Sequence, residues 1–174
     1  MSENAIDSIL NRYSCRNFKS DPLKEGDLER LMEALRWAPS AGNCQPWFFY
    51  VVTNREVKEG LSRAAHDQSF IVNAPVVFVV CANTKEAAFC YGERGQTLYC
   101  LQDTAAATEN LLLAATALGY GSCWIGAFEE EEASEVLNIP QSLRPVAIIP
   151  VGFAKSRGMR TDRKPVDDIF EFVT

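Results

Sequence analysis

The sequence predicts an α+β fold, because short apolar strands are scattered among helical segments without a regular strand–helix–strand alternation. The chain of 174 residues is the length of one domain, 1–174, and can bury roughly two-thirds of its unfolded surface. An apolar content of 47% and a charged content of 23% are typical of a globular protein. Three runs have the composition of strands: WFFYVV at 47–52, VVFVVCA at 76–82 and RPVAIIPVGFA at 144–154.

These strands are expected to differ in their place in the sheet. The run at 76–82 is apolar on both faces, which predicts a central strand. The run at 47–52 is expected to be a buried strand as well. In the third run, Pro150 lacks an N–H donor and predicts an edge or a bulge position.

The longest helix is expected between residues 97 and 118, and it is apolar around most of its circumference. Its few polar residues fall on a narrow stripe, in which Gln102, Glu109 and Thr116 are spaced by seven residues. An apolar helix of about 33 Å must be enclosed by other elements or by a second copy of the chain. Gly119 is expected to end it in the left-handed conformation, and the turn GYGSCWIGAF that begins there is a candidate site.

The other helices follow from local patterns. Helical spacing of apolar residues predicts helices over 4–13 and 24–38, the second stopped by the proline that follows it. A short surface helix is expected at 55–65, and acidic residues mark a further helix start in 129–140. Residues 83–96 are expected to form a loop with helical turns.

Charge and hydropathy exclude several classes of partner. Seventeen Lys and Arg against 23 Asp and Glu give a net charge of -6, which disfavours nucleic acid or an anionic membrane as the main partner. The apolar runs are far shorter than the ~18 residues that span a bilayer, and the N-terminus MSENAIDSI has no signal-peptide character. The protein is therefore expected in the cytoplasm.

In that setting the cysteines are expected to be reduced thiols. None lies in a CxxC pair and the chain has a single histidine, His66, so a zinc or iron–sulfur site is disfavoured and no metal is expected. A nucleophilic Cys44 is disfavoured too, because that histidine lies in an unrelated polar segment. The six residues are Cys15, Cys44, Cys81, Cys90, Cys100 and Cys123.

Cations gather in two segments of this acidic chain. The motif RYSCRNF surrounds Ser14 with Arg12 and Arg16, whose guanidinium groups suit phosphate oxygens. The segment 155–164 carries Lys155, Arg157, Arg160, Arg163 and Lys164. The two segments are expected to meet at one phosphate, although helix-terminus cations and a solvated tail are the alternatives.

A loop, PSAGNCQPW, leads into the first strand and is a second candidate site, because loops at strand ends carry sites. Its Ser40 and Asn43 can instead simply satisfy turn backbone. Gly119, Gly121 and Gly126 do not form a dinucleotide fingerprint, since they follow a helix where that motif follows a strand.

Four motifs in this order, RYSCRNF, PSAGNCQPW, GYGSCWIGAF after an Ala/Leu-rich helix, and VGFAKSR to RKP, resemble the nitroreductase family of FMN-dependent oxidoreductases. The resemblance spans nearly the whole chain. It implies a mainly antiparallel central sheet flanked by helices, a homodimer built on the long central helix, and FMN in each of two interface clefts.

The resemblance also implies roles for individual residues. Arg12, Tyr13, Ser14 and Arg16 correspond to N-terminal FMN contacts, and Arg163 adds a phosphate contact. Pro39, Ser40, Ala41 and Asn43 correspond to a loop that the partner subunit lends to the same flavin. Ile125, Gly126 and Ala127 correspond to the turn beside flavin N5, and Gln68 stands where many members have a basic residue near the ring.

The implied activity is hydride transfer from NAD(P)H through flavin N5 to a small oxidised acceptor, such as a nitroaromatic, a quinone or a flavin, by a ping-pong mechanism. Arg16 would stabilise negative charge on the reduced flavin, and the Gly126 backbone would lie at N5, so these two residues are the catalytic candidates. The chain lacks the insertions that cover the flavin in larger members. A flavin-binding protein that stores or senses electrons without steady turnover is the alternative.

Overall fold

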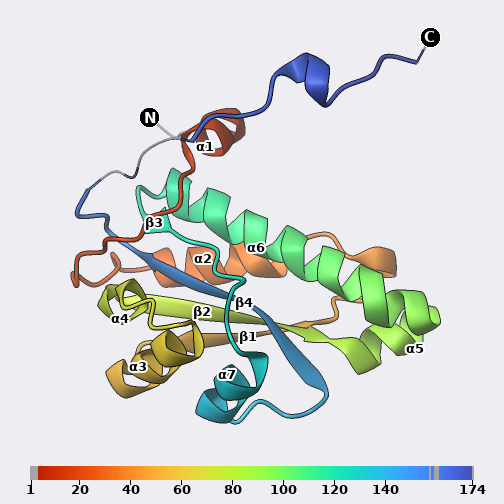
Figure 1. The fold of residues 1–174 in the computed structure, drawn as a ribbon, viewed down its shortest axis with the longest axis horizontal. Coiled ribbons are helices and arrows are strands. Elements are labelled where there is room, and N and C mark those ends of the chain that lie inside the picture. Colours follow the sequence, from red (N-terminus) through yellow and green to blue (C-terminus); the bar gives the residue numbers. More distant parts are fainter. Residues whose placement is uncertain (1–3, 157, 159–160, 174) are drawn as a thin grey trace.

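The computed structural model describes residues 4–156, 158 and 161–173, which fold around a four-stranded sheet (Figure 1). The strands are β1 (Trp47–Val52), β2 (Val76–Asn83), β3 (Gly121–Ser122) and β4 (Leu143–Gly152), arranged in the order β1-β2-β4-β3. Each neighbouring pair is antiparallel. The predicted α+β class with an antiparallel sheet is confirmed, and β2 occupies the predicted central position.

Helices cover both faces of the sheet (Figure 1). They begin and end close to the predicted bounds in most cases. The α-helices are α1 (Ala5–Asn11), α2 (Asp27–Arg36), α3 (Arg55–Ala64), α4 (Phe70–Asn73), α5 (Thr84–Arg94), α6 (Cys100–Ala117) and α7 (Glu130–Leu137). Single turns of other helix types are η1 (Ala41–Asn43), η2 (Gly95–Tyr99) and η3 (Val166–Asp168).

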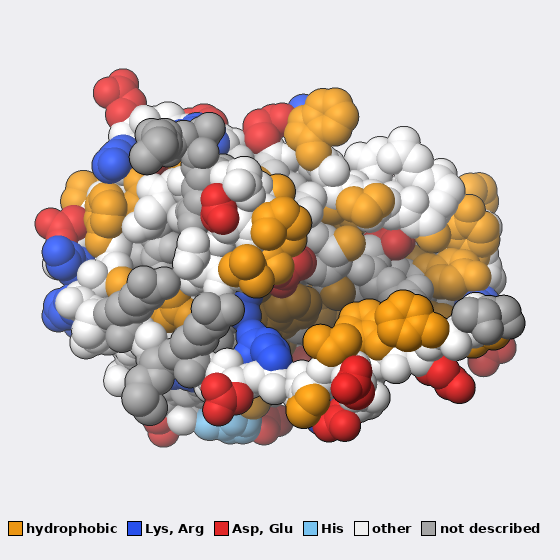
Figure 2. Space-filling view, turned by 90° about the horizontal axis from the view of Figure 1, so that it is seen from above, with side chains coloured by type: hydrophobic (Ala, Val, Ile, Leu, Met, Phe, Trp, Pro, Cys, Tyr) orange, Lys and Arg blue, Asp and Glu red, His pale blue; other side chains and the backbone are white. Residues whose placement is uncertain are grey.

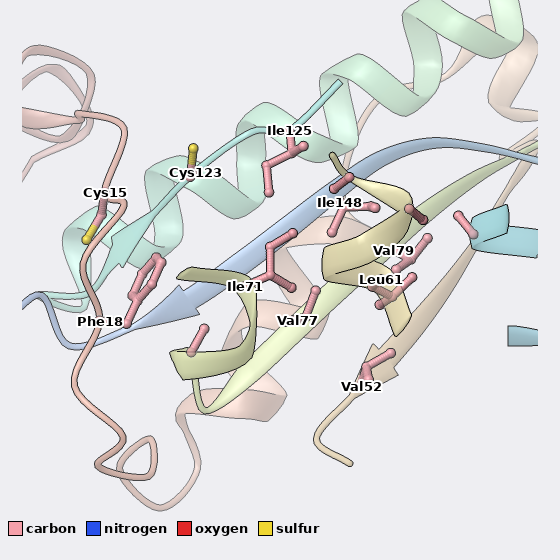
Figure 3. Close-up of a cluster of buried hydrophobic side chains, with 14 of the residues drawn as sticks. Cys15, Phe18, Val52, Leu61, Ile71, Val77, Val79, Cys123, Ile125 and Ile148 are labelled. Atoms are coloured by element: carbon pink, nitrogen blue, oxygen red, sulfur yellow. The ribbon is translucent and has the colours of Figure 1, made fainter. Parts of the chain in front are cut away.

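Alternate side chains of β2 build two separate cores, as the pleat of a strand requires. Phe78 and Val80 point to the face covered by α2 and α6, where they pack with Leu31 and Leu111. Val77, Val79 and Cys81 point to the face covered by α3, α4 and α7, where they join Leu61, Ile71 and Ile148 (Figure 3). The result is three layers, with the sheet in the middle.

The long helix α6 ends as predicted. Gly119 has φ +83°, the left-handed conformation that favours glycine at a helix C-terminus. The chain then turns back through β3 along the edge of β4. Among the described residues no helix is long and apolar enough to cross a membrane.

Three expectations about secondary structure were wrong. The strand at 47–52 is an edge strand with half-exposed side chains, because only β2 pairs with it. Residues 84–94 form α5 rather than a loop, although its backbone leaves helical geometry at Tyr91 and Gly92. Strand β4 is internal, not an edge, and the irregularity in its pairing lies opposite Val80 and Cys81.

Pro150 is tolerated inside β4 because of where β3 stops. The N–H and C=O of one strand residue point to the same side, and the Pro150 carbonyl accepts from the Cys123 N–H at 3.3 Å. The missing N–H of Pro150 therefore faces Cys123. Because β3 ends at Ser122, the proline interrupts no pairing between β3 and β4.

The expectation of six reduced thiols was also wrong. Cys44 and Cys90 form a disulfide, with their Cα atoms 6.8 Å apart. Their separation of 46 residues gives no local signal of pairing. The other four cysteines, Cys15, Cys81, Cys100 and Cys123, are free and buried.

Candidate functional site

A cavity of about 790 Å³ opens between α1, the segment after it, α6 and the C-terminal segment. Seen from above, the surface is hollowed there, and Lys and Arg side chains lie at the edge of the hollow (Figure 2). Its volume is within the range of about 300–1,000 Å³ that is usual for cofactor and ligand pockets. The lining residues are Ile9, Leu10, Arg12, Tyr13, Ser14, Arg16, Asn17, Glu109, Ser156, Gly158, Thr161 and Arg163.

The two cationic segments therefore meet, as the sequence predicted. Arg12 and Arg16 from the N-terminal motif and Arg163 from the C-terminal segment line the same cavity. Arg157 and Arg160 lie outside the described residues. Within the described ranges, none of the ion pairs involves Arg12, Arg16 or Arg163, although Nη1 of Arg163 donates to the Thr161 carbonyl and hydroxyl and to the Asp162 carbonyl.

The sheet fixes the N-terminal part of this cavity. Arg12 ends α1, and the chain then runs beside β3, where the Cys15 N–H donates to the Ser122 carbonyl at 2.8 Å. Cys15 and Phe18 are buried in the core, as Figure 3 shows for both residues. Because neighbouring side chains of an extended segment point to opposite sides, Ser14 and Arg16 project outward.

Glu109 is a cavity residue that the sequence analysis did not identify as part of the site. It projects from the middle of α6, and it belongs to the polar stripe that the helical pattern showed. Burial raises the pKa of the Glu109 carboxyl, and the positive charge of Arg12 acts against that shift. The helical stripe was visible in the sequence, but which residue of the stripe faces α1 depends on how the two helices pack.

Two other polar atoms mark this region. The Ser122 hydroxyl is buried and has no hydrogen-bond partner among the described residues, and Ser122 pairs with Ser14 beside the cavity. Burial raises the pKa of the neighbouring Cys123 thiol, while the charges of Arg16 and Arg12 act against it. Ser122 itself does not line the cavity.

The turn at 125–127 lies a few residues beyond Ser122. Ile125 is buried and pairs with Ile148 of β4, whereas Gly126 and Ala127 are exposed. Gln68 joins them, because its Nε2 donates to the Ala65 carbonyl at 3.0 Å and to the Ala127 carbonyl at 3.5 Å. The structure thus brings Gln68 to the three candidate residues of this turn, but none of the four lines the cavity.

The loop at 39–45 is not brought to the cavity of the same chain. It lies beside α5 and the start of α6, whereas α1 lies over the other end of α6 (Figure 1). The Ala41 N–H donates to Asp103 Oδ1 at 3.0 Å, and Asp103 precedes Glu109 by six residues, about 9 Å along the helix. Pro39, Ser40, Ala41 and Asn43 line no part of the cavity.

The loop has its own set of contacts. The Gln45 N–H donates to the Ser40 hydroxyl at 3.0 Å. Gly42 has φ +54° and lies against the Tyr91 hydroxyl so closely that a Cβ atom would not fit. Asp103 Oδ2 is buried and unpaired within the described part of the chain.

Across residues 4–156, 158 and 161–173, no group of three or more His, Cys, Asp or Glu side chains could hold a metal ion. His66 lies 3.9 Å from a Glu129 oxygen at the surface, far from the arginine cluster in the sequence.

Comparisons with known proteins agree with the resemblance seen in the motifs. The model of the Nitroreductase family matches residues 9–153. A protein of Archaeoglobus fulgidus, named as an NADH dehydrogenase/NAD(P)H nitroreductase, is 36% identical over 88% of this chain and 87% of its own length. A Bacillus subtilis protein named FMN reductase (NADPH) is 26% identical over 96% of this chain and 72% of its own.

A solved structure shows the same fold over the full length of the chain. The crystal structure of a nitroreductase family protein from Streptococcus pneumoniae superposes with a TM-score of 0.86. The two sequences are 26% identical, and the match covers 97% of this chain and 100% of that one.

Proposed function

The chain belongs to the nitroreductase family, and we propose that it is an FMN-dependent oxidoreductase that uses NAD(P)H as the hydride donor. The observation that carries the proposal is the cavity in which Arg12, Arg16 and Arg163 meet beside Ser14. Bound FMN would supply the hydride chemistry, taking two electrons from the nicotinamide and passing them to a small oxidised acceptor such as a nitroaromatic, a quinone or a flavin.

The arginine cluster is suited to the phosphate of FMN. Each charge-assisted hydrogen bond from Arg12, Arg16 or Arg163 is worth about 1.5–3 kcal/mol. The Ser14 hydroxyl, which lines the same cavity, can donate to the same group. Together these contacts would favour FMN over riboflavin, which has no phosphate, by at least ~100-fold.

The other residues of the proposed site act on the flavin ring. Arg16 would hold a positive charge near the pyrimidine edge and stabilise the negative charge that develops during reduction. The exposed Gly126 and Ala127 leave room for flat ligands to lie against the ring. Gln68 would stabilise their turn through its hydrogen bond to the Ala127 carbonyl. One open face would serve donor and acceptor in turn, which is the basis for a ping-pong order of binding.

A homodimer follows from the distance between the loop at 39–45 and the cavity. If that loop contacts flavin, it must contact the flavin of a second chain. The exposed apolar residues support such a partner: Ile6, Ile9 and Leu10 on α1, and Val166, Ile169, Phe170, Phe172 and Val173 in the C-terminal segment, are each half or more exposed. Light scattering should therefore show a dimer, and a flavin-loaded monomer at micromolar concentration would contradict a site built by two chains.

One experiment tests the proposed function as a whole. Apoprotein is titrated with FMN and with riboflavin, and the FMN complex is then mixed anaerobically with NADH or NADPH in a stopped-flow instrument. We expect FMN to bind more tightly than riboflavin. We also expect the flavin absorbance to be bleached after the FMN complex is mixed with NADH or NADPH. Equal affinity for the two flavins would contradict the phosphate cluster, and FMN that neither nucleotide bleaches would favour a storage or sensing protein.

A further inference from the structure

The disulfide between Cys44 and Cys90 lies where it can control the loop at 39–45. Cys44 follows η1 directly and its N–H donates to the Ala41 carbonyl at 3.0 Å, so its position sets the end of the turn. Cys90 lies on α5, which belongs to a different part of the fold. The bond therefore ties the loop to the body of the molecule.

The partner end of this bond sits at a break in its helix. The residues that follow Cys90, Tyr91 and Gly92, leave helical geometry, with φ values of −140° and +58°. The Tyr91 hydroxyl lies against Gly42 of the loop. Cys90 and Tyr91 thus contact the loop from adjacent positions, at the point where α5 leaves helical geometry.

Exposure separates these two sulfur atoms from the other four. Cys90 is exposed and Cys44 is half-buried, whereas Cys15, Cys81, Cys100 and Cys123 are buried. Burial raises the pKa of each free thiol, that of Cys81 to about 12, which makes these thiols inert. Of the described cysteines, this bonded pair alone includes an exposed residue, which leaves the disulfide open to attack by a thiol in solution.

We propose that the Cys44–Cys90 disulfide is a redox-controlled latch on the loop at 39–45. The thiolate of a dithiol reductant attacks the Cys90 sulfur of the disulfide and forms a mixed disulfide with it. The Cys44 thiolate is released and takes a proton. The second thiol of the reductant then displaces Cys90. In total the S–S bond gains two electrons and two protons, and the dithiol becomes a cyclic disulfide.

Release of the latch leaves the loop with its hydrogen bond to Asp103 and its contact with a less constrained Tyr91. Because a cross-link restricts the open conformations of the segment it closes, its loss lets the loop leave its place more often. The inference rests on the proposed function only in its prediction of flavin affinity, because the proposed function assigns the loop to the flavin of the second chain. The opening of the loop itself can be measured without flavin.

The test compares oxidised protein with protein treated with dithiothreitol, in the wild type and in Cys90→Ser. Thiol titration after denaturation should give four thiols in the oxidised wild type and six after reduction. Hydrogen exchange of the peptide 39–45 in apoprotein should accelerate at least tenfold on reduction, and FMN affinity should fall about tenfold. Cys90→Ser should match the reduced wild type in both measurements and ignore dithiothreitol.

Six thiols in protein isolated without reductant would overturn the proposal, as would equal exchange rates in the two redox states. A change on reduction that also occurs in Cys90→Ser would place the effect elsewhere and overturn it too. If the apoprotein binds no FMN in either state, the proposed function fails, while thiol count and exchange still decide the latch. Cys44→Ser, which breaks the same bond from the other side, shows whether any effect comes from the bond or from the serine.

Discussion

The cavity and the loop at 39–45 are candidate parts of one site, yet they are held in place by different means. The cavity segment 12–16 pairs with β3 and buries Cys15 in the core of the sheet. The loop buries no side chain in either core and is held by a hydrogen bond, a ring contact and a disulfide. The first region can move only if the sheet is disturbed, whereas the second can be released by local chemistry.

This difference is consistent with the cavity binding the ligand and the loop controlling access to it. A phosphate cluster must keep its charges at fixed distances, so attachment to the core serves it well. A loop that covers part of a ligand on another chain must be able to let that ligand in. Three predictions, beginning with the largest expected effect, test whether the two regions really behave in these two ways.

Arg163→Gln should weaken FMN binding by ~10–150-fold, because it removes one charge-assisted contact worth about 1.5–3 kcal/mol from the cavity. Riboflavin binding should not change, since riboflavin has no phosphate to lose a contact. Lys164→Gln is the matched control, because Lys164 is the next residue, carries the same charge and does not line the cavity. Equal losses in both variants would mean that net charge, not a placed guanidinium, attracts the flavin.

Gly121→Ala should cost about 1–3 kcal/mol of unfolding free energy and should also lower FMN affinity. A Cβ atom at this position would lie 2.6 Å from the Cys15 Cβ, so the segment 12–16 would have to leave β3. Gly126→Ala is the control, because nothing lies within 4 Å of its added Cβ, and its stability should stay within ~0.5 kcal/mol of the wild type. Urea denaturation measures both, and a neutral Gly121→Ala would show that the cavity segment is not fixed by the sheet.

The same contrast explains what the sequence could predict. The motif RYSCRNF was predicted as a site because two arginines flank a serine, and the alternation of this extended segment turns these polar residues outward, where they meet Arg163 in one cavity. The apolar run of β2 predicted its central place for a similar reason. Both rest on a local pattern that the pleat of a strand translates directly into a direction.

Features that depend on packing between distant segments were missed. Glu109 was visible as part of a polar stripe, but only the packing of α1 on α6 brings it to the cavity. Cys44 and Cys90 share no local pattern, because the fold of the chain between them, over a separation of 46 residues, brings them together. The segment 83–96, predicted as a loop with helical turns, contains the helix α5, whose backbone leaves helical geometry at Tyr91 and Gly92.

The smallest predicted effect concerns Asp103, the buried carboxyl that accepts from the Ala41 N–H. Burial raises the pKa of Asp103, and the hydrogen bond from Ala41 acts against that shift. Since the folded state then binds the proton more tightly than the unfolded state, stability falls as the pH rises from the ordinary pKa of aspartate through the raised pKa of the folded protein.

Asp103→Asn keeps an acceptor for the Ala41 N–H and removes the titrating charge. Its stability should lack this part of the pH dependence and should equal or slightly exceed that of the wild type at neutral pH. Asp103→Ala removes the acceptor as well, so exchange of the Ala41 amide should accelerate in this variant and not in Asp103→Asn. Denaturation curves across acidic pH, with hydrogen exchange at neutral pH, separate these effects. Parallel pH profiles for the wild type and Asp103→Asn would mean that folding does not shift the pKa of this carboxyl, and would contradict the raised pKa on which the prediction rests.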